Sequence, residues 1–156
     1  MNTALRVSAA LLVGVLSTSI AQGQKLSCVK DVQYNKEFLA KYPDAGAACQ
    51  EVKVIAGQKW ARFNAEVKGN VDSHITVDFL NSSSKPMENP LTFVYTPDAT
   101  LTLDNGKAKA ASNVKKGEKV VVWVPESRFG IYAQPGSVDN ERFRLASDES
   151  SATKQR

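Results

Sequence analysis

The sequence predicts a mainly β protein, folded as a small antiparallel barrel (OB-like or SH3-like) of about six to eight strands with one short N-terminal helix tied by a disulfide. Two observations predict this class. From Val52 onward, apolar and polar residues alternate, as in half-buried strands. Turn signals recur about every 8–12 residues. The barrel is expected to be closed or partly closed, because closure removes exposed strand edges.

The helix is predicted just before the first strand. Four apolar or aromatic residues share helical spacing: Tyr34, Phe38, Leu39 and Tyr42. Asn35 or Asp31 is the expected N-cap, and Pro43 ends the helix because the residue before a proline is disfavoured in helical conformation. A helix of about two turns is not stable alone, so it must pack on the sheet.

The strands follow in order along the rest of the chain. They are predicted within 51–69 (two strands around a turn at 56–58), 74–80, 91–97, 99–112 (a hairpin turning at 104–106), 113–125 and 128–136, and Phe143 and Leu145 alternate after them. Residues 81–90 form a polar loop with two prolines. The apolar run Val120–Val124 is expected to be the most central strand, buried on both faces.

The first 23 residues have the layout of a secretory signal peptide, with Arg6 followed by a short apolar run and then small residues. The run is shorter than the roughly 20 residues of a spanning helix. An uncleaved anchor and a lipid-bearing Cys28 are the alternatives. A single domain is expected over 24–146 and a disordered tail over 147–156. The protein is thus predicted to be periplasmic or secreted, without a transmembrane segment after cleavage of the signal peptide.

The cysteines and the charge limit the function further. Cys28 and Cys49 are the two cysteines, and in an exported chain an even count favours a disulfide. The 20 basic residues barely exceed the 16 acidic ones, and no block of like charge is longer than two residues. A nucleic-acid partner is not expected, because such proteins usually carry a basic stripe. No cofactor is expected either.

Three sequence stretches carry a resemblance. "FLAKYP" followed by a cysteine, "WARFNAEV", and "KKGEKVVVWVPESRFG" are similar to segments of uncharacterised small exported β-rich proteins of Gram-negative bacteria. The resemblance covers most of the mature chain. It implies an exported β-rich protein, and it assigns no activity and no functional residues.

The best candidate for a binding site is the stretch "VVVWVPESRFGIY", at 120–132. Alternation places Val121 and Trp123 on one face of a strand that ends at Pro125. The candidate binding residues are Trp123, Glu126, Arg128 and Tyr132, of types enriched at interaction sites. Candidate partners are an envelope protein or an anionic glycan or lipid. In the competing interpretation, Trp123 caps the core under the helix, and Glu126 pairs with Arg128 on the surface.

Two other classes of function compete with binding. A copper carrier would use His74 and Met87, yet soft-metal sites usually need more sulfur ligands. A small hydrolase would need acids brought together by the fold, and the candidates are Glu66, Asp72, Asp78 and Glu126. His74 and Ser73 are adjacent in a strand, so their side chains point to opposite faces. A non-enzymatic binding or accessory module is therefore the expected function.

Overall fold

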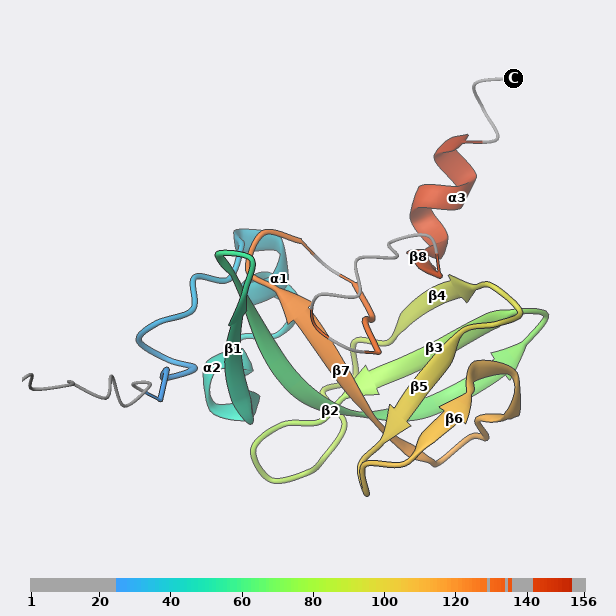
Figure 1. Cartoon of the computed structure of the whole chain (residues 1–156), viewed down its shortest axis with the longest axis horizontal. Coiled ribbons are helices and arrows are strands. Elements are labelled where there is room, and N and C mark those ends of the chain that lie inside the picture. The colour runs from blue at the N-terminus through green and yellow to red at the C-terminus, as the bar shows by residue number, and fades with distance from the viewer. Residues whose placement is uncertain (1–24, 129, 134, 136–141, 153–156) are drawn as a thin grey trace, which may run out of the picture.

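The computed structural model describes residues 25–128, 130–133, 135 and 142–152. Within them, eight antiparallel strands form one strongly twisted sheet (Figure 1). The signal peptide predicted over 1–23 lies outside the described residues. No helix in the described ranges is long and apolar enough to cross a membrane. The mainly β, antiparallel class predicted from the sequence is confirmed.

The elements follow one another with short connections. In chain order they are α1 (Lys36–Lys41), α2 (Ala45–Ala48), β1 (Glu51–Ile55), β2 (Gln58–Val71), β3 (His74–Phe79), β4 (Leu91–Tyr95), β5 (Thr100–Leu103), β6 (Ala108–Ala110), the 3-10 turn η1 (Ala111–Asn113), β7 (Lys119–Pro125), β8 (Phe143–Leu145) and α3 (Ala146–Ala152). Asn35 caps α1, since its side chain accepts a hydrogen bond from the backbone N–H of Phe38.

The 14-residue strand β2 organises the sheet. Its first half pairs with β1 along one edge, its second half pairs with β3, and β7 pairs along the opposite edge. The register to β3 shifts between Val67 and Gly69, which marks a β-bulge. A bulge bends its strand and increases the local twist. The long, bent strand β2 therefore pairs with three strands, β1, β3 and β7.

Of the predicted closed or partly closed barrel, full closure is not found in the described part of the chain. The strand order is β6-β5-β7-β2-β3-β4-β8, with β1 paired to β2 beside this path. Among the described residues no ladder joins the outer strands β6 and β8, so the sheet stays open. Both strands are only three residues long. Short outer strands limit the exposed edge that closure would otherwise remove.

The main core lies between the sheet and α1. The inward row of β2 is fully buried as predicted: Ala61, Phe63, Ala65 and Val67. Phe38 of α1 and its C-cap residue Tyr42 pack against Phe63 and Phe79, with the Tyr42 and Phe79 rings perpendicular at 4.9 Å. Leu39, which also belongs to the predicted stripe, is exposed.

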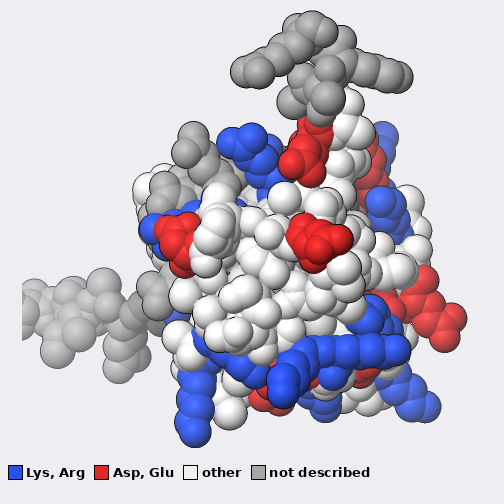
Figure 2. Space-filling model, turned by 90° about the vertical axis from the view of Figure 1, so that its right-hand side faces the viewer, with Lys and Arg blue, Asp and Glu red and all other residues white. Residues whose placement is uncertain are grey.

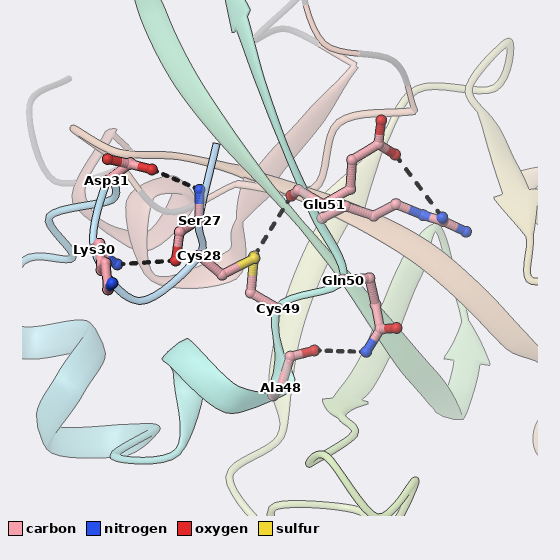
Figure 3. The surroundings of a disulfide bond; sticks show 9 residues. Ser27, Cys28, Lys30, Asp31, Ala48, Cys49, Gln50 and Glu51 are labelled. Atoms are coloured by element: carbon pink, nitrogen blue, oxygen red, sulfur yellow. Dashed lines mark hydrogen bonds and ion pairs between the residues drawn. A yellow bond between two sulfur atoms is a disulfide. The ribbon is translucent and has the colours of Figure 1, made fainter. Parts of the chain in front are cut away.

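The predicted disulfide between Cys28 and Cys49 is present, with a Cα–Cα distance of 5.8 Å. Its two half-cystines flank α1 and α2, so it ties the helical segment to the start of the sheet (Figure 3). Asp31 supports the turn after Cys28 by accepting a hydrogen bond of 2.6 Å from the backbone N–H of Ser27. Cys49 is followed almost directly by Glu51, the first residue of β1.

Two predictions near the C-terminus differ from the structure. The described residues of 128–136 form no strand. Instead, Ile131 packs in the main core and Tyr132 packs with Trp60 and Trp123 on the other face of the sheet. The predicted disordered tail begins at residue 147, whereas Ala146–Ala152 form the helix α3. Asp148 and Glu149 lie in its first turn, where acidic side chains stabilise a helix. Residues 153–156 lie outside the described part of the chain.

Candidate functional site

Strand β7 separates two apolar layers, as its sequence predicts. Val120, Val122 and Val124 join the main core. Val121 and Trp123 point to the other face, where they form the outer cluster with Trp60 and Tyr132. β7 is paired with β5 and β2 along its two edges, and the main core and the outer cluster cover its two faces. The strand is therefore buried throughout from Val120 to Pro125.

Two of the predicted site residues, Trp123 and Tyr132, belong to the outer cluster. Trp123 and Tyr132 are each only 6% exposed. Burial raises the pKa of the Tyr132 phenol, and the charge of Arg128 offsets part of that rise. Trp123 belongs to a cluster separate from that of Phe38 and Tyr42, so the competing interpretation that it caps the core under the helix is wrong.

A row of side chains crosses three strands next to this cluster. Glu51 of β1 is the register partner of Arg62 of β2, and Arg62 is the partner of Trp123 of β7. Side chains of directly paired residues lie on the same face of a sheet. An ion pair of 4.0 Å joins the Arg62 guanidinium to the Glu51 carboxylate, and Lys53 Nζ lies 3.6 Å from the same carboxylate.

An open groove lies over this row, with a volume of about 410 Å³. We call it the Trp123 groove; its lining residues are Glu51, Lys53, Ile55, Arg62, Thr102, Val121, Trp123, Ala133 and Pro135. The Lys53 ammonium sits over the Trp123 ring, 4.9 Å from the ring centre, in a cation–π contact. The groove thus combines an apolar floor with two cations and one carboxylate on its rim.

Glu126 and Arg128 occupy the connection after β7, and Glu126 has a structural role. Its carboxylate accepts a hydrogen bond of 2.7 Å from the backbone N–H of Gln33 and lies 3.6 Å from Lys59 Nζ. Lys59 also donates to the backbone carbonyl of Asp31. Glu126 therefore holds the N-terminal segment against the sheet by pairing with Lys59, in place of the predicted pair with Arg128. Arg128 is exposed.

The copper candidates His74 and Met87 lie far apart. His74 begins β3, while Met87 donates a backbone hydrogen bond of 2.9 Å to Phe79, at the far end of that strand. A six-residue strand spans about 16 Å between its end residues. Across the described ranges, no group of three or more His, Cys, Asp or Glu residues is placed to hold a metal ion.

Of the four candidate hydrolase acids, Glu66 and Asp78 lie side by side on neighbouring strands, whereas Asp72 and Glu126 lie elsewhere. Glu66 and Asp78 are direct partners across β2 and β3. Asp78 is 3% exposed, and its Oδ1 accepts a hydrogen bond of 3.0 Å from the backbone N–H of Asn89. This hydrogen bond attaches the loop 81–90 to β3. Asp72 lies in the turn after β2, and Glu126 is engaged by Lys59.

The sequence prediction missed the rim of the Trp123 groove. Alternation within β1 places Glu51, Lys53 and Ile55 on one face, and this signal is visible in the sequence. What the sequence does not reveal is that this face continues that of Arg62 and Trp123. The chain matches no protein-family model, no curated protein and no solved structure.

Proposed function

We propose that this protein is an exported, non-enzymatic binding module of the Gram-negative envelope, and that its Trp123 groove takes an acidic peptide segment of a partner protein. The observation that carries the proposal is the row Glu51–Arg62–Trp123, which places the partly exposed Arg62 guanidinium beside the buried Trp123 indole in the lining of the groove. Tryptophan and arginine are among the residues that contribute most to protein interfaces.

The chemistry of the groove supports an acidic peptide. Lys53 and Arg62 outnumber the single carboxylate of Glu51, so the rim has a net charge of +1. Ile55, Val121 and Pro135 supply apolar contacts next to these cations. A segment that carries a carboxylate beside an aliphatic side chain matches both. The disulfide supports export, because disulfides persist in oxidising compartments.

The proposal is tested by NMR titration with short peptides that alternate glutamate and leucine. Bound peptide should shift the amide resonances of β1 and the first half of β2. Lys53→Gln and Arg62→Gln should each weaken binding by about fivefold, since each removes one charged contact. Their melting temperatures should stay near that of the wild type, because both ion pairs to Glu51 are partly exposed.

A matched control removes a charge elsewhere. Lys36→Gln alters an exposed lysine of α1, which does not line the groove, and should leave peptide affinity unchanged. Tyr132→Ala is unsuitable because that side chain is buried. Equal losses in Lys36→Gln and Lys53→Gln, or resonance shifts that avoid β1, would reject the Trp123 groove as the binding site.

A further inference from the structure

The positive charge of the chain is concentrated in one short segment. Residues 107–119, "KAKAASNVKKGEK", contain five lysines and one glutamate. The remaining residues contain 15 basic and 15 acidic side chains (20 minus 5, and 16 minus 1), so they are neutral in sum. The net charge of +4 therefore equals the charge of this one segment. No single run of like charge reveals it, because alanine, serine, asparagine and glycine separate the lysines.

The fold turns this segment into one wall of a second open groove, with a volume of about 800 Å³. We call it the lysine groove; it is lined by Gly69, Asn70, Val71, Lys109, Ser112, Asn113, Val114, Lys115 and Lys116. The end of β2 forms the opposite wall. The lysine groove and the Trp123 groove have no lining residue in common.

Asn70 holds the two walls together. Its side-chain amide donates hydrogen bonds of 2.8 Å to the backbone carbonyls of Ala111 and Val114. Its side-chain oxygen accepts a hydrogen bond of 2.8 Å from the Tyr95 hydroxyl, which fixes the orientation of the amide. The turn η1 is thereby fastened to the end of β2. The groove is consequently preformed, which lowers the entropy cost of binding.

Glu118 orders the lysine side of the groove. Its carboxylate accepts hydrogen bonds of 2.6 and 2.8 Å from Lys109 Nζ and one of 2.7 Å from the backbone N–H of Lys115. These bonds hold the pKa of Glu118 below its ordinary value, with the Lys109 bond as the largest cause. Glu118 thus balances Lys109, and it leaves the groove with an excess of charge from Lys115 and Lys116.

The lysine ends and the polar side chains are open to solvent. Lys115, Lys116, Ser112 and Asn113 are all exposed. In the described part of the chain, no carboxylate forms an ion pair with the Lys116 side chain. Figure 2 presents the side of the molecule where β6 and the β2–β3 turn lie, and it shows Lys and Arg side chains gathered in a band along the lower edge of this face.

We propose that the lysine groove binds an anionic polysaccharide, a sugar chain with carboxylate or sulfate groups along its length. The ammonium groups of Lys115 and Lys116 would pair with successive acidic groups. The Ser112 hydroxyl and the Asn113 amide would exchange hydrogen bonds with sugar hydroxyls. The concave shape fits a chain better than a flat bilayer. This proposal does not depend on the peptide function of the Trp123 groove.

The test is calorimetric titration of the full mature protein with oligogalacturonate, a carboxylated sugar chain, at low and high salt. The expected result is saturable binding that weakens with salt, because exposed charges are screened. Lys115→Gln/Lys116→Gln should weaken binding about tenfold, since it removes two charge-assisted contacts. Ser112→Ala, which keeps every charge, should weaken it about twofold through the lost hydroxyl.

Three controls separate this proposal from general attraction between charges. Lys36→Gln/Lys41→Gln removes the same charge from α1 and should leave affinity unchanged at moderate salt. Neutral dextran should not bind. Vesicles containing phosphatidylglycerol should bind more weakly than the sugar chain. Equal losses in the two double variants, absence of oligogalacturonate binding, or stronger capture by vesicles through Lys115 and Lys116 would each overturn the proposal.

Discussion

The Tyr132 ring stands edge-on against Trp60, with ring centres 4.7 Å apart and ring planes at 89°. This contact holds Tyr132 in the outer cluster, although residues 130–133 form no strand. Perpendicular aromatic pairs are stabilised beyond the area they bury, since the positive edge of one ring meets the negative face of the other. The contact also leaves little space around Tyr132 for an added side chain at residue 130.

Gly130→Ala should disturb the outer cluster. A Cβ atom at residue 130 would lie 2.3 Å from Cε2 of Tyr132, so the ring must move. We expect a loss of about 1–3 kcal/mol in the free energy of unfolding, as for other overpacked sites. Urea denaturation measures the loss, and near-ultraviolet circular dichroism reports the displaced aromatic pair.

Gly69→Ala is the matched control for this substitution. A Cβ atom on Gly69 would meet no atom within 4 Å, and the residue does not adopt a positive φ. Its free energy of unfolding should stay within about 0.5 kcal/mol of the wild type. The close packing of Tyr132 would be refuted if the Gly130 variant were as stable as the Gly69 variant.

Two tyrosines at α1 should respond oppositely to phenylalanine. The Tyr34 hydroxyl is buried and has no hydrogen-bond partner among the described residues, whereas the Tyr42 hydroxyl donates to the backbone carbonyl of Asn89. Removing an unsatisfied hydroxyl relieves a desolvation cost, so Tyr34→Phe should raise the free energy of unfolding by about 1 kcal/mol. Tyr42→Phe should lower it by about 1 kcal/mol. Equal losses in both variants, measured by urea denaturation, would show that Tyr34 has a partner.

Stability should fall at alkaline pH. Burial raises the pKa of Tyr34 from its ordinary value of 10.0 to about 12, with the nearby Glu126 charge adding to the rise. The folded protein therefore holds this proton more tightly than the unfolded chain, which titrates near pH 10. The stabilisation is complete below pH 10 and declines as pH rises toward 12.

Ultraviolet titration of the tyrosines in folded and urea-denatured protein measures this difference directly. Burial also raises the pKa of Tyr42 and Tyr132, so the folded curve should lie at higher pH. In Tyr34→Phe, the decline in stability above pH 10 should become shallower. Coincident folded and denatured titration curves would contradict the burial of these phenols.

Reduction of the disulfide should loosen the helical segment. Cys28 and Cys49 are 21 residues apart, and closing a loop of that length stabilises the folded state by about 3 kcal/mol in the chain-entropy model. Urea denaturation with and without reductant should show a loss of this size, and hydrogen exchange should increase first in α1. An unchanged midpoint after verified reduction would mean that α1 is held by its aromatic contacts alone.

Much of the fold was predictable because it depends on local patterns. The alternation through Phe63 and Val67 identifies the inward face of β2, and the Asn35 cap identifies the start of α1. The outward face was harder to interpret, because Trp123 and Tyr132 have the residue types of a binding surface and yet are buried. Their burial depends on Trp60, which is distant in the chain.

The sequence by itself determined the class of fold, the faces of the central strands and the disulfide pairing, because each follows from local periodicity or from a count of two cysteines. Only the tertiary structure decided that the sheet stays open, that Glu51, Arg62 and Trp123 form one row, and that Asn70 joins the lysine segment to β2. Periodicity specifies which way a side chain points. Its neighbours depend on strand pairing and register, which contacts between distant parts of the chain decide together.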